Sequence, residues 1–189
     1  MRCFFAAEPD KCAREQLARV LTAAKEGLGE NADAFRWVPA KNIHITLHFL
    51  GNVELPVVGQ LTELLQHGLS EAQFSVRTST LGRFPSGGPP KVLWLGLDQG
   101  AEELGRVYRE LAESIEKVGL RIEDRPFTAH VTLARARDRD RSLARRIKWP
   151  AVIQPQPIEW RATQIALMQS DLSGPAPEYR RIAAIPLRA

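Results

Sequence analysis

The sequence has little cysteine. Cys3 and Cys12 are the only two cysteines in 189 residues, and neither a C-x-x-C pair nor a zinc-type spacing of ligands occurs. Disulfide-framed secreted domains and zinc modules both need more cysteines than this, so these classes are excluded. We expect two free thiols and, because reduced thiols are typical of a reducing compartment, a cytoplasmic location.

Long hydrophobic runs are also missing. No stretch approaches the roughly 20 apolar residues of a membrane span, and the apolar start MRCFFAAEPD reaches acidic residues and proline too early for a secretory signal. The composition, 44% hydrophobic and 25% charged, is that of an ordinary globular protein. The sequence therefore predicts a soluble protein without membrane contact, in a single domain over residues 1–189.

The excess of charge of one sign is small. The formal charge is +4 and the sequence pI is near 9.4, mostly because of arginine, whose planar guanidinium suits phosphate. A polyanion such as RNA is a compatible partner, but many basic proteins bind no nucleic acid. Charge alone leaves the partner open.

Strands and helices alternate along the chain. Apolar residues at helical spacing predict helices over 9–29, 54–70 and 100–120, and a short basic helix over 139–149. Extended patterns predict strands within 2–8, 36–51, 74–84, 91–98, 125–137, 155–173 and 179–188. Two similar rounds of strand and helix indicate an α/β chain of two related lobes.

One motif occurs on two of the predicted strands. HITL begins at His44 and HVTL at His130, so His44 and Thr46 lie two residues apart, as do His130 and Thr132. Side chains on a strand alternate between its faces, and each pair therefore shares a polar face opposite apolar neighbours. Two such strands facing each other would build a pocket of two imidazoles and two hydroxyls.

These residue types suit the cleavage of a phosphodiester. The unperturbed imidazole pKa of about 6.5 allows one ring to be neutral and another protonated near neutral pH. The pair can then take a proton from the attacking oxygen and give one to the leaving oxygen. Threonine hydroxyls can donate hydrogen bonds to the non-bridging phosphate oxygens. This scheme requires no metal.

The paired motifs resemble the signature of the 2H phosphoesterase superfamily. Within it, the chain is similar to the bacterial and archaeal RNA 2′,3′-cyclic phosphodiesterases, historically called 2′-5′ RNA ligases. The similarity extends to RCFFAAE, NIHITLHFLG, LWLGL, FTAHVTLAR and SDLSGPAPEY, and so covers nearly the whole chain. The resemblance implies a bilobal α+β fold in which two antiparallel sheets, with helices outside, flank a central cleft and each gives one motif.

The resemblance also implies an activity, the hydrolysis of an RNA 2′,3′-cyclic phosphate to a 2′-phosphomonoester. His44 would protonate the leaving 3′ oxygen and His130 would activate water, with Thr46 and Thr132 binding the phosphate; the symmetry of the motifs leaves the reverse assignment open. The expected partner is RNA with a cyclic end, tRNA fragments included, and the expected enzyme is a monomer without a cofactor. Reversal of the reaction would give ATP-independent 2′-5′ ligation, and which direction is physiological stays open.

Arg135 matches an arginine that close relatives place after the second motif, where it would contact the phosphate. Strand alternation puts Arg135 on the face opposite His130, so this role requires the strand to end, twist or bulge near Ala134. The sequence departs from the family at Ala129, where relatives usually have proline. Alanine leaves the approach to His130 less constrained.

Other interpretations stay open beside this one. The site could cleave ADP-ribose 1″,2″-cyclic phosphate or a 2′-5′ oligonucleotide, or the chain could be a non-catalytic module that binds RNA ends. Near the first motif, we interpret His48 as a surface or rim residue. Phe49, which has the parity of Ile45 and Leu47, is predicted to lie in the core.

Overall fold

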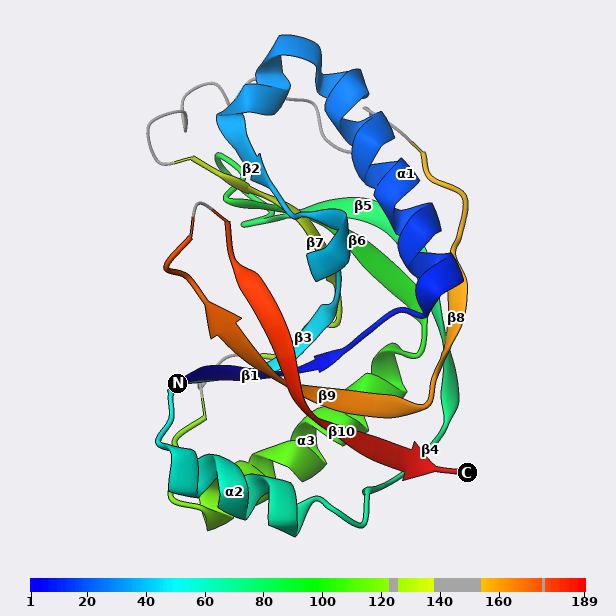
Figure 1. Cartoon of the computed structure of the whole chain (residues 1–189). Helices are drawn as coiled ribbons and strands as arrows, with labels where there is room; N and C mark the ends of the chain where they lie inside the picture. The colour runs from blue at the N-terminus through cyan, green and yellow to red at the C-terminus, as the bar shows by residue number, and fades with distance from the viewer. Residues whose placement is uncertain (123–125, 138–153, 175) are drawn as a thin grey trace.

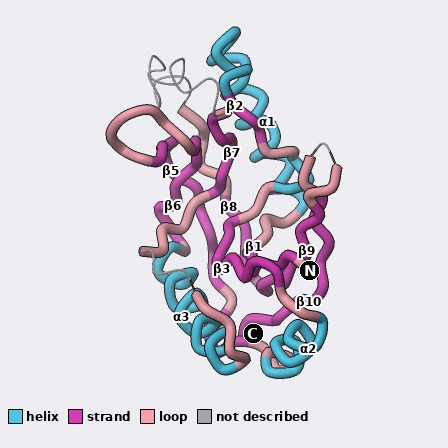
Figure 2. The backbone as a smooth tube through the Cα atoms, turned by 90° about the vertical axis from the view of Figure 1, so that its left-hand side faces the viewer, coloured by secondary structure: helices cyan, strands magenta, loops and turns pink. Residues whose placement is uncertain are grey.

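The computed structural model describes residues 1–122, 126–137, 154–174 and 176–189. Strands occupy the middle of the molecule, and Figure 2 shows the helices at its two ends, α1 (Lys11–Leu28) at one and α2 (Leu55–Leu64) with α3 (Ala101–Lys117) at the other. The short basic helix expected over 139–149 lies outside the described residues.

Local sequence determines where the helices begin and end. Asp10 caps α1 by accepting a hydrogen bond from the Ala13 amide (2.8 Å), and Gly29 follows the helix with a φ of 53°. The three helices expected over 9–29, 54–70 and 100–120 are confirmed, although α2 ends at Leu64 because the chain then turns into a strand. In the described part of the chain, no helix has the length and hydrophobicity to cross a membrane.

Ten strands among the described residues form one sheet, and nine of them follow a single hydrogen-bonded path. Its order is β4-β10-β9-β1-β3-β7-β6-β5-β8, and β2 also pairs with β7. The pairs are antiparallel except for β4–β10, which is parallel. The strands are β1 (Arg2–Ala7), β2 (Phe35–Trp37), β3 (Ile45–Asn52), β4 (Leu69–Ala72), β5 (Phe74–Phe84), β6 (Val92–Gln99), β7 (Val131–Ala136), β8 (Glu159–Ala162), β9 (Gln164–Asp171) and β10 (Glu178–Arg188).

The path divides into two halves. The first half contains β4, β10, β9, β1 and β3, and the second contains β7, β6, β5 and β8 with β2 beside β7 (Figure 1). In the described residues, the halves are joined by one pair, Ile45 on β3 with Val131 on β7. The expected arrangement of two antiparallel sheets is therefore not confirmed, since the halves form one hydrogen-bonded path that is narrow at this junction.

The halves do not follow the order of the sequence. β9 and β10, near the C-terminus, lie beside β1, whereas β2 from the N-terminal third crosses to β7. The expectation of two successive rounds of strand and helix is therefore wrong in its connectivity. Periodicity identifies which segments are strands, but pairing depends on contacts between distant segments.

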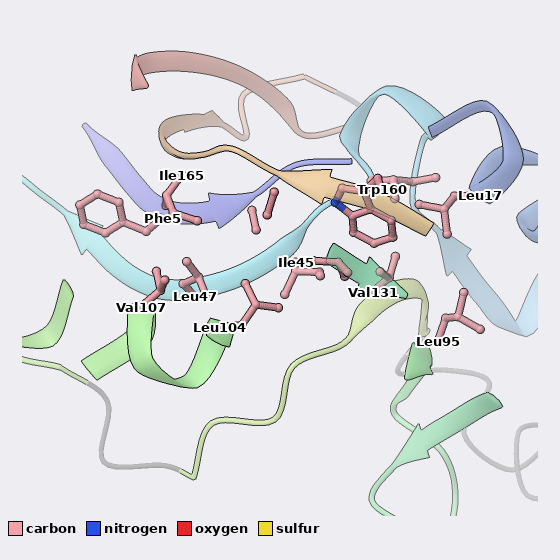
Figure 3. Close-up of a cluster of buried hydrophobic side chains, with 14 of the residues drawn as sticks. Phe5, Leu17, Ile45, Leu47, Leu95, Leu104, Val107, Val131, Trp160 and Ile165 are labelled. Carbon is pink, nitrogen blue, oxygen red and sulfur yellow. The ribbon is translucent and has the colours of Figure 1, made fainter. Parts of the chain in front are cut away.

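The core covers one face of each half. In Figure 3, Leu104 of α3 lies beside Leu47 of the first half, while α1 brings Leu17 to the side of the second. The junction residues Ile45 and Val131 are fully buried in the same core. Because neighbouring residues on a strand point to opposite faces, this burial turns the adjacent histidines and threonines to the other face.

Candidate active site

The two His–Thr motifs lie side by side where the halves meet. Continuing the Ile45–Val131 register by one residue in each direction places each histidine opposite the threonine of the other motif, so that His44 lies across from Thr132. All four polar side chains are half-buried. The adjacent strands β3 and β7 therefore bring two imidazoles and two hydroxyls onto one face.

His44 lies between η2 (Ala40–Asn42) and β3, and hydrogen bonds fix its ring. Nδ1 donates to the carbonyl oxygen of Asn42 at 2.6 Å, and Nε2 lies 2.9 Å from Thr46 Oγ1. Since a carbonyl only accepts, Nδ1 carries a hydrogen, and Nε2 of the neutral ring accepts from the Thr46 hydroxyl. Phe4 and Tyr179 pack against the ring, with centroid distances of 5.0 and 5.5 Å.

His130 repeats this arrangement at the start of β7. Its Nδ1 donates to the carbonyl oxygen of Thr128 at 2.7 Å. The rings of Phe84 and Trp94 approach it edge-on, at centroid distances of 5.2 and 6.0 Å. In both motifs, Nδ1 thus bonds to the carbonyl two residues earlier, which leaves Nε2 as the nitrogen that can exchange a proton with a substrate.

Burial and nearby charges act on both imidazoles. Desolvation lowers the pKa of His44, while the Asn42 carbonyl and the Glu8 carboxylate raise it and Arg135 lowers it. Desolvation also lowers the pKa of His130, its own carbonyl bond raises it, and Arg135 lowers it. Both pKa values therefore lie below the usual imidazole value, and a carboxylate opposes this shift at His44.

Arg135 reaches the face of the motifs through a β-bulge. The β6–β7 register shifts between Leu93 and Trp94, so Leu133 and Ala134 are buried in succession and Arg135 is exposed. This is the irregularity that a phosphate contact by Arg135 requires. Its charge also lowers the pKa of both histidines. Arg135 and Tyr179, which packs against the His44 ring, line one cavity.

A similar bulge in β3 overturns two expectations. The β1–β3 register shifts between Thr46 and Phe49, so Leu47 and His48 are both buried and Phe49 is 44% exposed. His48 is not a rim residue, because its Nε2 donates to the Tyr108 carbonyl at 2.8 Å and its ring stacks on Tyr108 at 3.8 Å. Phe49 is not a core residue and lies on the same side of the strand as the polar pair.

Sequence reasoning missed three side chains near the motifs, Phe49, Glu8 and Tyr179. Phe49 follows its histidine by five residues, as Arg135 follows the other histidine, and this equal spacing could have identified it. Glu8 directly follows β1 and Tyr179 lies on β10, and both are distant in sequence from the first motif. No local pattern marks these two as neighbours of His44.

Cavities open beside the first motif. Two of them, of about 500 and 220 Å³, are both lined by Phe4 and Tyr179. The larger also contains Arg2, Phe49 and Arg135 in its wall. The smaller also contains Glu8, Lys41, His44 and Arg181. Guanidinium groups suit phosphate and aromatic rings suit a nucleobase, so these walls could hold a nucleotide end.

A further cavity, of about 910 Å³, lies beside the second motif. Its walls include Trp94, Gly96, Phe127, Thr128 and Ala129. In the residues that the structure describes, no group of three or more His, Cys, Asp or Glu side chains is placed to hold a metal ion. The chemistry that the side chains themselves offer is proton transfer by two imidazoles next to hydroxyl and guanidinium donors.

Comparison with known proteins identifies relatives over most of the chain. The family model described as the 2′-5′ RNA ligase superfamily matches residues 9–174. The chain is 29% identical over 164 residues to the RNA 2′,3′-cyclic phosphodiesterase of Aeropyrum pernix, covering 86% of this chain and 92% of that protein. It is 31% identical over 200 residues to the RNA 2′,3′-cyclic phosphodiesterase of Thermus thermophilus, covering 100% of this chain and 91% of that protein.

A solved structure shows the same fold. E. coli LigT complexed with 3′-AMP superposes with a TM-score of 0.78 at 25% identity, covering 98% of this chain and 97% of that one. The similarity to the 2H phosphoesterases that the paired motifs predict is thereby confirmed. The chain belongs to the 2′-5′ RNA ligase superfamily.

Proposed function

We propose that this protein hydrolyses the 2′,3′-cyclic phosphate at an RNA end to a 2′-phosphomonoester by metal-independent acid–base catalysis. The observation that carries the proposal is the junction of the halves, where two imidazoles, two threonine hydroxyls and Arg135 share one face. The relatives from A. pernix and T. thermophilus, both named RNA 2′,3′-cyclic phosphodiesterases, support this choice of substrate.

Each side chain of the motifs has one task in this reaction. Neutral His130 takes a proton at Nε2 from water as the water oxygen bonds to phosphorus. Protonated His44 gives its Nε2 proton to the 3′ oxygen as the P–O3′ bond breaks, so the phosphate stays on the 2′ oxygen. Thr46, Thr132 and Arg135 hold the non-bridging oxygens, whose negative charge grows in the transition state. Proton exchange with solvent then restores the starting states.

The same groups allow ligation. An RNA 5′-hydroxyl in the place of water would attack the phosphorus of a cyclic end as the P–O3′ bond breaks, with His130 taking the 5′-hydroxyl proton and His44 protonating the 3′ oxygen, and so form a 2′-5′ linkage without ATP. The exposed ring of Phe49 offers a stacking surface for the base next to the phosphate. The proposed substrate class is therefore an RNA end, such as that of a tRNA fragment.

We further propose that residues 1–189 form one bilobal domain that acts as a monomer, each half giving one motif. The two-fold arrangement of motif, bulge and aromatic neighbours about the junction supports this organisation. A cytoplasmic location is supported by the two cysteines, which are both free.

Product identification tests the proposed reaction. The purified full chain is incubated, with excess EDTA, with a short RNA that ends in a 2′,3′-cyclic phosphate, and the terminal phosphate is identified. We expect a 2′-phosphate from the wild type and from His67→Ala, since His67 is an exposed histidine in the turn before β4. We expect His44→Ala and His130→Ala to form the 2′-phosphate about 10²–10⁴-fold more slowly than the wild type.

Other products would point to the remaining candidates. A 3′-phosphate, or full activity in both motif variants, would contradict the proposed chemistry. Turnover of ADP-ribose 1″,2″-cyclic phosphate or of a 2′-5′ dinucleotide in place of the cyclic RNA would assign another 2H reaction. Binding of the RNA end without turnover of any of these would identify a binding module.

A further inference from the structure

The two histidines differ in the residue that lies across the neighbouring strand. In the β1–β3 pairing, Ala7 lies opposite Ile45, so the next position places Glu8 opposite His44. Directly opposite residues of an antiparallel pair have Cβ atoms about 4.5–5.5 Å apart. Glu8 and His44 also line the same cavity of about 220 Å³. A carboxylate therefore lies next to the first imidazole, on the face of the motif.

The second half has a glycine at the corresponding place. In the β6–β7 pairing, Leu95 lies opposite Val131, so the next position places Gly96 opposite His130. A Cβ atom at Gly96 would lie 2.8 Å from Ser79 Oγ, closer than Cβ atoms approach a neighbouring atom. The second half thus has no side chain, and no carboxylate, at the place where the first half has Glu8.

Two arginines hold the Glu8 carboxylate in place. Arg181 donates to Oε2 from Nη2 at 2.6 Å and from Nε at 3.1 Å, and Arg14 donates to Oε1 at 3.3 Å. Arg14 also donates to the Lys41 carbonyl at 2.8 Å, in the segment that leads into His44. The Glu8 side chain is only 18% exposed. The Glu8 carboxylate is therefore held in one position, where water screens its charge poorly.

From this geometry, and resting on the proposed function, we propose that Glu8 is a positioning residue that favours the protonated form of His44 over that of His130 and so makes His44, and not His130, the acid of the reaction. The other charged or titratable groups around His44 are cationic or phenolic. They are Arg14 on α1, Lys41 on η2, Arg135 on β7, and Tyr179 and Arg181 on β10. Glu8 is the carboxylate among the described neighbours.

The electrostatic effects on the two rings agree with this role. The Glu8 charge raises the pKa of His44 against the desolvation that lowers it, whereas Arg135 and Arg14 lower it. At His130 the effects come from desolvation, a carbonyl bond and Arg135, with no carboxylate of the described residues among them. Histidine therefore occupies two symmetry-related positions, and its surroundings suit it to act as an acid in one of them and as a base in the other.

Titration of each histidine in the full chain tests the proposal. Imidazole NMR resonances are followed against pH in the wild type and in Glu8→Gln, which keeps the size of the side chain but removes its charge. We expect the pKa of His44 to fall and that of His130 to stay unchanged. We also expect kcat at pH 7 to fall on the order of tenfold without a rise in KM, because protonated His44 becomes scarcer while binding is kept.

Glu71→Gln is the matched control. Glu71 on β4 also accepts two hydrogen bonds from an arginine, Arg106, at 2.6 and 3.2 Å, and its side chain is 16% exposed. It lies outside the walls of the cavities beside the motifs. Loss of this ion pair should leave the pKa of both active-site histidines, kcat and KM as in the wild type.

The outcomes separate this proposal from the proposed reaction. An unchanged pKa of His44 in Glu8→Gln, or an equal fall at both histidines, overturns the role of Glu8 whatever the activity. Failure of the reaction itself would appear as a wild type that titrates normally but does not turn over RNA ends. If Glu8→Gln does not fold, Glu8→Asp withdraws the charge by one methylene, and the pKa of His44 must again fall alone.

Discussion

The two halves of the site present the same motif in different surroundings. Each histidine precedes a strand at the junction, bonds through Nδ1 to a carbonyl two residues earlier, packs against two aromatic rings and is followed by a β-bulge. Across the neighbouring strand, His44 meets Glu8 and His130 meets Gly96. The two motifs therefore have the same local geometry and differ in the residue that lies opposite each histidine on the neighbouring strand.

This difference shows how a repeated motif can carry two roles. Acid–base catalysis by two identical groups requires that one be protonated while the other is neutral, and identical surroundings would not favour one assignment over the other. A single carboxylate beside one ring is sufficient to distinguish them. Substitutions in either half test whether the two histidines differ in this way.

Removal of either histidine should have the largest effect. We expect kcat/KM to fall about 10²–10⁴-fold in His44→Ala and in His130→Ala, because each removes one proton transfer. The wild-type profile of kcat/KM against pH should be bell-shaped. Activity falls toward acid as His130 is protonated and falls toward base as His44 loses its proton. Burial lowers the pKa of both rings, so the bell should lie on the acid side of the usual imidazole value of 6.5.

The limbs of these profiles distinguish the two roles. In His44→Ala, residual activity should no longer fall toward base, and in His130→Ala it should no longer fall toward acid. The opposite pattern would exchange the acid and the base. Profiles with both limbs intact in both variants would contradict catalysis by the pair.

Arg135→Gln should have the next largest effect. A hydrogen bond to a charged group contributes about 1.5–3 kcal/mol, so we expect kcat/KM to fall roughly 10–100-fold. Because the charge of Arg135 lowers the pKa of both histidines, both limbs of the profile should also move to higher pH. Arg161→Gln is the control, because Arg161 is an exposed arginine on β8. It should change neither kcat/KM nor the pH at which the two limbs of the profile lie. A loss of activity with unmoved limbs would place the Arg135 charge away from the histidines.

Phe49→Ala should have a smaller effect of a different kind. Phe49 occupies in the first half the place that Arg135 occupies in the second, but it carries no charge. Loss of a stacked base contact of about 1–3 kcal/mol should raise KM, by about tenfold, with kcat and both limbs unchanged. Phe49→Tyr keeps the aromatic face and should restore KM. Equal KM values in Phe49→Ala and the wild type would show that the ring does not contact the substrate.

The sequence predicts the motifs well and their neighbours poorly. Alternation of apolar and polar residues correctly predicts that Ile45 and Val131 share a face opposite the histidines, because strand periodicity is a local property. The same alternation predicts the wrong face for Phe49 and Arg135, which lie five residues after His44 and His130. A bulge in each strand adds one residue and turns these side chains to the other face. Whether a strand bulges depends on its partners, which the local pattern does not contain.

The same limit applies to strand order and to Glu8. Strand order and register follow from the packing of segments that are far apart in the sequence, such as β1 with β9 and β3 with β7. Glu8 therefore looks like the ordinary end of a strand in the sequence. Only the pairing of β1 with β3 places it opposite His44.

The smallest effect is expected on the free energy of unfolding in mild acid. His48 in the first half, which belongs to neither motif, contributes to this effect. His48 occupies the place that Ala134 has in the second half, and desolvation lowers its pKa as it does for the two motif histidines. The unfolded chain therefore binds protons at a higher pH than the folded protein. The free energy of unfolding should be fully present above the usual imidazole pKa of about 6.5 and should fall as the pH drops, by at most about 1.4 kcal/mol per pH unit for each such histidine.

His48→Gln isolates the contribution of this residue. A glutamine amide can still donate to the Tyr108 carbonyl that accepts from His48 Nε2, but it does not titrate. Urea denaturation at several pH values between 5 and 8 should show a weaker loss of stability toward acid in His48→Gln than in the wild type. His67→Gln, at an exposed histidine, controls for the loss of an imidazole. Parallel curves for His48→Gln and the wild type would contradict the prediction, since they would show that His48 binds its proton equally well in the folded and the unfolded chain.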